Sequence, residues 1–150
     1  MRNWILAPHI DDEIIGCYSL FANGNVERVV YFYDLTPERR QEAIDISEAM
    51  GYQVSFNGYQ CDIPEDVVLY VPNIADNHIH HKNVNRYAKT LHNKKMYYSV
   101  DMNVPFNVLS VDDQQRKYGW LCMFRTQAKL LSDEKYHLFE SLMAVSYTHL

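Results

Sequence analysis

The 150-residue chain lacks the long apolar runs, basic blocks and paired cysteines that mark several classes of protein. No stretch approaches the roughly 18 consecutive apolar residues of a membrane-spanning helix. No Lys/Arg block is longer than a pair such as Arg39-Arg40, and the net charge is -5, which argues against nucleic acid as a partner. The three cysteines, Cys17, Cys61 and Cys122, have no CxxC pairing, so they predict reduced, buried thiols rather than a zinc ribbon.

Both ends of the chain carry signals of their own. The N-terminus reaches Pro8 and His9 too soon for the apolar segment of a signal peptide, so we expect a cytoplasmic protein. Residues 144–150 have no usable pattern and resemble translated sequencing-adapter read-through, which is typical of an artefactual tail in place of the natural C-terminus.

Apolar runs typical of strands alternate with helix-like segments through most of the chain. Residues 29–33 form a continuous apolar run that suits a strand covered on both faces. Thr36 and Pro37 predict the start of a helix that ends at Gly51. The expected strands span 4–7, 26–33, 52–56, 67–71 and 96–100, and the expected helices span 14–22, 37–50, 82–92 and 112–131. This order predicts one α/β domain over residues 1–143, a Rossmann-like three-layer sandwich with a mainly parallel sheet flanked by helices.

The first polar loop places a histidine and two adjacent carboxylates directly after an apolar run. The run covers residues 4–7, and His9, Asp11 and Asp12 follow it. In open α/β sheets the chemistry collects at the carboxyl ends of the strands, which is where this loop is expected to lie. Taken alone, a histidine beside acidic residues is more often a surface turn than a metal ligand. Buried together, however, these groups call for a cation.

The second polar loop covers residues 72–81, follows the run 67–71 and contains His78, His80 and His81. Taken alone, this triplet could be a fortuitous metal-scavenging loop. Because both loops leave the carboxyl ends of predicted strands, their combination favours a metal site.

The ligand set predicted from the two loops is His9, Asp12 and His81. Two imidazole nitrogens and one carboxylate, with an open position for water, are typical of a catalytic zinc, although such ligands also accept iron and other divalent ions. In an extended loop Asp11 points away from Asp12, so Asp11 is free to act as a general base towards a bound water. His78 is expected to protonate a leaving amine or to stabilise an oxyanion.

Four segments together resemble the motifs of one enzyme family. Residues 8–13, with Gly16, resemble the His-Pro-Asp-Asp-Glu signature of the PIG-L/LmbE family of zinc-dependent de-N-acetylases. Residues 39–43 resemble the family's Arg-x-x-Glu helix, residues 78–81 its His-Pro-Asp-His segment, and residues 124–127 its Tyr-x-Ser-Gln stretch. The similarity spans about residues 4–140.

The resemblance implies the roles already predicted and adds a substrate contact. It implies metal ligation by His9, Asp12 and His81, general-base catalysis by Asp11, acid or oxyanion assistance by His78, and substrate binding by Arg39. The alternative for Arg39 is a solvated charge on a helix face, paired with a nearby Glu.

The chain departs from the family pattern at three positions. Ile10 replaces the usual Pro of the first motif, and Ile79 and His80 replace Pro and Asp of the second. His80 is the more serious departure, because the family's Asp is expected to orient His78 and tune its pKa, and a histidine cannot supply that negative charge. We therefore expect lower activity, or another carboxylate such as Asp76 in that role.

Three hypotheses of function follow. The first is a zinc-dependent hydrolase that removes an N-acetyl group from an amino sugar or sugar conjugate of the N-acetylglucosamine type and releases acetate. The second is a weakened or inactive relative that binds carbohydrate or metal. The third, a nucleotide-binding regulator, is disfavoured because no Gly-rich phosphate loop follows the first strand-like run.

Overall fold

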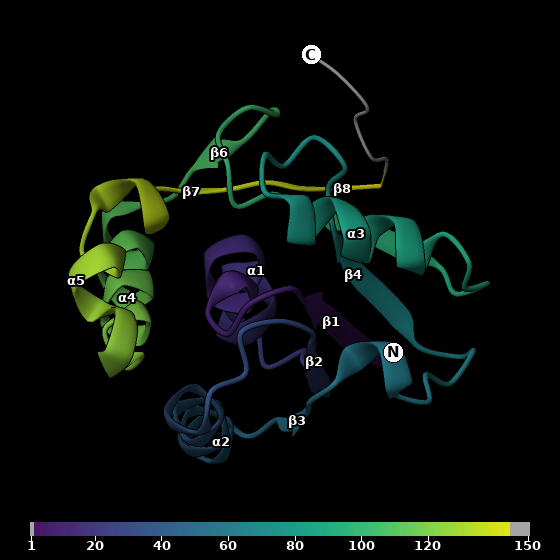
Figure 1. Ribbon diagram of the computed structural model, residues 1–150. Helices are drawn as coiled ribbons and strands as arrows, with labels where there is room; N and C mark the ends of the chain where they lie inside the picture. The colour runs from purple at the N-terminus through teal and green to yellow at the C-terminus, as the bar shows by residue number, and fades with distance from the viewer. Residues whose placement is uncertain (1, 145–150) are drawn as a thin grey trace.

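A computed structural model describes residues 2–144 as an α/β fold built on a six-stranded sheet (Figure 1). Its strands are β1 (Asn3–Ala7), β2 (Arg28–Tyr31), β3 (Gln53–Ser55), β4 (Val68–Pro72), β5 (Lys95–Tyr98) and β8 (Leu142–Met143). They lie in the order β3-β2-β1-β4-β5-β8, and every neighbouring pair is parallel except β5 with β8. The predicted α/β class with a mainly parallel sheet is confirmed.

Helices cover both faces of this sheet. Within residues 2–144 they are α1 (Asp12–Ala22), α2 (Pro37–Met50), α3 (Ile79–Ala88), α4 (Val111–Leu121) and α5 (Ala128–Leu131). Figure 1 shows α3 on one side of the strands and α1 and α2 on the other, with α4 and α5 beyond α1. Short elements complete the chain: the 3-10 turns η1 (Gly58–Gln60), η2 (Arg125–Gln127) and η3 (Glu134–Tyr136), and the ribbon of β6 (Asn107–Val108) with β7 (Phe139–Glu140). The layers are those of a Rossmann-like three-layer sandwich.

The central strand β1 is buried along its whole length, and its side chains alternate between the two cores. Ile5 and Ala7 belong to the cluster that also contains residues of α1 and α2. Trp4 and Leu6 belong to the cluster that contains residues of α3. This pattern is expected of a parallel strand with helices on both sides, and it explains why the run reads as continuously apolar.

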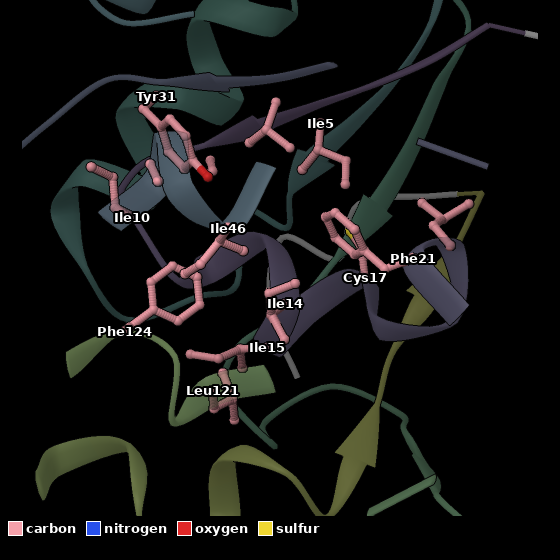
Figure 2. Packing of buried hydrophobic residues seen from close by; sticks show 14 of the residues in the cluster. Ile5, Ile10, Ile14, Ile15, Cys17, Phe21, Tyr31, Ile46, Leu121 and Phe124 are labelled. Atoms are coloured by element: carbon pink, nitrogen blue, oxygen red, sulfur yellow. The ribbon is translucent and has the colours of Figure 1, made fainter. Parts of the chain in front are cut away.

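The larger core joins α1 to the C-terminal half of the chain. Figure 2 shows Ile14 and Ile15 of α1 beside Ile46 of α2, with Leu121 and Phe124 packed against the same cluster. The helix predicted over residues 112–131 is wrong, because the chain leaves α4 after Leu121 and turns through η2 before α5. Phe124 is fully buried at this turn, so its packing overrides the local preference for a continuous helix.

Gly16 lets α1 approach the sheet closely. A Cβ atom at this position would lie 2.1 Å from Cδ2 of Tyr98, whose ring fills the space and whose hydroxyl donates to the carbonyl of Leu6 at 2.7 Å. Only glycine therefore fits there without displacing the ring. This contact fixes the N-terminal end of α1 beside the carboxyl end of β1.

The helix predicted to end at Gly51 does so, and this glycine has φ 82° as its C-terminal cap. The three cysteines are free, but only Cys17 is buried, while Cys61 and Cys122 are half-buried. No helix among residues 2–144 is long and apolar enough to cross a membrane. Except for Ala144, the tail 144–150 lies outside the described residues.

Candidate metal centre

The two polar loops meet because β1 and β4 are parallel neighbours in the sheet. The first loop leads from β1 into α1, and the second leads from β4 into α3. His9 Nδ1 and His81 Nε2 lie 3.2 and 3.1 Å from the same oxygen, Oδ2 of Asp12. Ligands about 2.0–2.2 Å from one ion in a tetrahedral site lie roughly 3.3–3.5 Å apart, so these spacings suit three ligands of one ion. The predicted set His9, Asp12 and His81 is thus brought together as a group that could hold a metal ion.

A second carboxylate behind the group fixes the donor atom of His81. Asp76 is fully buried, and its Oδ2 lies 2.9 Å from His81 Nδ1. Since this bond places the ring hydrogen of the neutral imidazole on Nδ1, the lone pair on Nε2 faces the carboxylate oxygen of Asp12. Two acceptors in that position are stable only with a proton or a metal cation between them. The chemistry of the residues therefore fits a cation.

The pKa values of the same residues point to the same demand for positive charge. Burial lowers the pKa of His81, but Asp12 and Asp76 outweigh it and raise that pKa to about 10. Burial raises the pKa of Asp12, but the charge and hydrogen bond of His81 outweigh it and hold that pKa below its ordinary value. The site therefore favours a negative Asp12 next to a positive partner.

The other face of His9 contacts residues that were not predicted to lie there. His9 Nε2 lies 2.8 Å from Nδ1 of His80 and 3.3 Å from Oδ2 of Asp34. The ring of His80 stacks on Tyr33 with 3.8 Å between centroids and 3° between planes. A hydrogen on His9 Nε2 can be accepted by either neighbour, which leaves Nδ1 of His9 free as a metal ligand.

His78 is oriented by the backbone. It caps α3 at the N-terminus, where its Nδ1 accepts from the backbone N–H of His80 at 3.0 Å. The neutral ring consequently carries its hydrogen on Nε2 and can act as a donor. Burial lowers the pKa of His78, and the neighbouring His9 and His81 lower it further. Asp76, expected as a possible substitute for the family's Asp in orienting His78, contacts His81 instead.

Asp11 lies beside the group in a strained backbone conformation. Its φ is 129°, a region that side-chain-bearing residues rarely adopt, and its backbone N–H donates to Glu13 at 2.8 Å. Glu13 is fully buried and also accepts from the hydroxyl of Tyr31. Burial raises the pKa of Asp11 well above its ordinary value, and the carboxylates of Asp12 and Glu13 add to that effect.

Glu13 and Asp34 are the residues whose roles sequence reasoning missed. Burial raises the pKa of Glu13 to about 8, although its hydrogen bond from Tyr31 acts in the opposite direction. Asp34 follows β2, which is the other parallel neighbour of β1, so the rule that located both histidine loops could also have located this carboxylate.

The site opens into a cavity of about 340 Å³, whose lining includes all six predicted site residues: His9, Asp11, Asp12, Arg39, His78 and His81. Arg39 projects from α2, and its guanidinium makes no hydrogen bond or ion pair within the described part of the chain. The expected pairing with a nearby Glu is not found, because Glu42 bonds Thr126 instead. Arg39 also lines an adjoining hollow of about 510 Å³.

Comparison with known proteins adds no relative. No protein-family model, no curated protein and no solved structure matches the chain. What bears on function is thus the fold and the histidine–carboxylate group at the carboxyl ends of its strands.

Proposed function

We propose that the protein is a zinc-dependent N-deacetylase of the PIG-L/LmbE kind, which hydrolyses the N-acetyl group of an amino sugar or sugar conjugate. One observation carries the proposal: the buried His9–Asp12–His81 group shares a cavity with the second carboxylate, Asp11. The motifs that resemble those of the family support it as well. The products would be acetate and a free amine.

His9, Asp12 and His81 would hold the ion through Nδ1, a carboxylate oxygen and Nε2. Zinc bound there would polarise the substrate carbonyl and lower the pKa of a bound water to about 7. The same ligand types also accept Fe²⁺. Asp76 would keep the Nε2 lone pair of His81 directed at the ion, as carboxylates behind metal-bound histidines generally do.

Asp11 would move the proton. As water oxygen bonds to the acetyl carbon, Asp11 accepts a water proton, and it then passes that proton to the amine nitrogen as the C–N bond breaks. Burial raises the pKa of Asp11, and the positive charge of a bound ion would act in the opposite direction and favour the carboxylate that accepts the first proton. The hydrogen bond from its backbone N–H to Glu13 keeps the strained loop in place.

His78 would hydrogen-bond the carbonyl oxygen as negative charge develops there. Its neutral ring offers an Nε2 hydrogen, because Nδ1 is engaged by the helix cap. A neutral imidazole is a good hydrogen-bond donor but a poor acid. Of the two roles expected for His78, the structure therefore favours oxyanion stabilisation over protonation of the amine.

Arg39 would contact the substrate. Its guanidinium, which has no polar partner among residues 2–144, lines the cavity and presents planar donors suited to sugar hydroxyls or to an anionic substituent. The cavity volume of about 340 Å³ is at the lower end of the usual range for small-molecule sites, roughly 300–1,000 Å³. A single amino-sugar ring with a short substituent is a suitable size.

The variant Asp11→Asn tests the proposal. We expect zinc content to stay at the wild-type level while acetate release from an N-acetylglucosamine conjugate falls at least about 100-fold, the usual contribution of a general base. Asp66→Asn, the same change at an exposed carboxylate bonded to Arg2, should leave both unchanged. Normal turnover by Asp11→Asn would refute the mechanism. A wild-type protein that retains zinc but releases no acetate would support the metal- or carbohydrate-binding alternative.

A further inference from the structure

Three histidines, His9, His78 and His80, form a group of their own beside the first one. His9, His78 and His80 each offer a ring nitrogen, and these atoms all lie within 4.8 Å of one another. Asp34 adds a carboxylate oxygen 3.3 Å from His9 Nε2. These residues come from the loops after three adjacent strands, β2, β1 and β4. Imidazole nitrogens with one carboxylate suit Zn²⁺, Co²⁺ and Ni²⁺.

We propose that His9, His78, His80 and Asp34 form a second metal-binding position, next to the first and weaker than it. The stacking of His80 on Tyr33 holds the His80 ring in place, with Nδ1 directed at His9. Asp34 has φ 55°, a turn conformation that Asp tolerates better than most residues. His80 and Asp34 are therefore in place before an ion arrives.

His9 links the two positions. Its Nδ1 faces Asp12 and its Nε2 faces His80, so the ring has one nitrogen for each position. Neutral imidazole has a single lone pair, so a His9 ring that already serves the first ion is a poorer ligand for a second one. The second ion is therefore bound more weakly than the first.

Ligation by His78 lowers the affinity for the second ion further. Its Nδ1 accepts from the backbone N–H of His80, and this bond caps α3. Ligation through Nδ1 displaces the cap directly. Ligation through Nε2 moves the ring hydrogen to Nδ1 and also ends the cap. Loss of a helix cap alone lowers the affinity for the second ion by roughly fivefold to tenfold.

Occupation of the second position has a consequence that rests on the proposed hydrolase function. An ion on His78 removes the hydrogen-bond donor assigned to the oxyanion, so metal in excess of one equivalent inhibits acetate release. The binding itself does not depend on that function. His80, which departs from the family pattern, thereby becomes a residue through which metal supply regulates the site.

Titration of the metal-free protein with Co²⁺ tests the proposal, followed by calorimetry and by the visible absorption of the ion. We expect two steps in the wild type, the second at least roughly tenfold weaker than the first. His80→Phe keeps a ring on Tyr33 but removes both nitrogens, so it should abolish the second step and retain the first. His92→Phe, at an exposed histidine outside the group, should retain both steps.

The outcomes separate this proposal from the hydrolase. A single step in the wild type, or a second step that persists in His80→Phe, overturns the second position. Retention of the first step in His80→Phe shows that the variant is folded. If two steps occur without any acetate release, the second position stands and the hydrolase fails. If acetate is released and only one step occurs, the hydrolase stands and the second position fails.

Discussion

Two histidine groups share His9 but differ in charge and burial. The inner group, His9, Asp12 and His81, contains a buried carboxylate and is supported by the buried Asp76. The outer group, His9, His78 and His80, lies nearer the surface, and the carboxylate next to His9 Nε2 is that of the exposed Asp34. Histidine therefore occurs in two different electrostatic environments.

The pKa values of the two groups shift in opposite directions. His81 in the inner group has its pKa raised to about 10 by carboxylates that outweigh burial. His78 and His80 in the outer group have lowered pKa values, because burial and neighbouring histidines disfavour their charged forms. The inner group thus demands a cation, whereas the outer group offers lone pairs without much negative charge. On the proposed assignment, buried carboxylates, more than the number of histidines, decide which group would bind an ion more tightly.

Asp12→Asn should have the largest effect on the metal affinity of the inner group. It removes the only carboxylate of the inner group and leaves the outer group intact. Loss of one partner of a buried charged pair costs about 3–5 kcal/mol, so we expect Zn²⁺ affinity of the inner group to fall roughly 1,000-fold. Competition with a chelating dye measures this loss. Wild-type affinity in Asp12→Asn would mean that the histidines alone hold the ion.

The inner group could be predicted from the sequence, and the reason is topological. Parallel neighbouring strands end at the same edge of a sheet, so His9 and Asp12 after one strand had to lie near His81 after the next. Residue types then determined the predicted ligand set. The proximity of these residues follows from strand order alone and does not depend on side-chain rotamers.

The outer group and the supporting contacts could not be predicted in this way. Whether Asp76 reaches His78 or His81 depends on side-chain directions within an irregular loop, and spacing does not determine those. The contact between His80 and His9 depends on stacking against Tyr33, a residue of another loop. The turn at Phe124 was missed for a similar reason, since distant packing partners decide where the chain leaves α4.

Asp76→Asn and His80→Phe should have smaller effects on the Zn²⁺ affinity of the inner group. Asp76→Asn weakens the partner of His81 Nδ1 and should lower Zn²⁺ affinity of the inner group by about 10–100-fold. His80→Phe removes one of two acceptors for His9 Nε2, and Asp34 remains, so the loss should be less than about tenfold. Chelator competition on both variants gives the ranking.

The control for this pair is Asp66→Asn, at an exposed carboxylate that pairs with Arg2 and precedes β4, at the opposite end of this strand from the second loop. It should bind Zn²⁺ as tightly as the wild type. The reverse ranking, with His80→Phe weaker than Asp76→Asn, would show that the outer group is the principal support of the ion.

Lys117 is a buried basic residue whose bonded partners are backbone carbonyls, whereas those of His81 are carboxylates. Its side chain is fully buried, and Nζ donates to the carbonyls of Ile15 and Phe139 at 2.7 and 2.6 Å. Burial lowers the pKa of Lys117 to about 7, although Glu140 of β7 and Cys17 of α1 counteract part of this effect. Where His81 gains a proton from its surroundings, Lys117 therefore tends to lose one.

The sign of the resulting pH dependence follows from the protons bound in each state. Unfolded lysine has a pKa of about 10.4, so between about pH 7 and 10 the unfolded chain binds more protons at Lys117 and stability rises with pH. From pH 6.5 to 8 this residue should add about 1 kcal/mol to the free energy of unfolding. Urea unfolding of Lys117→Met, compared with the wild type across that range, should lack this increment. Lys89→Met, at an exposed lysine, should retain it. Since Lys117→Met also leaves two buried carbonyls without their donor, the decisive quantity is the change with pH, and equal changes in Lys117→Met and the wild type would show that Lys117 stays charged when buried.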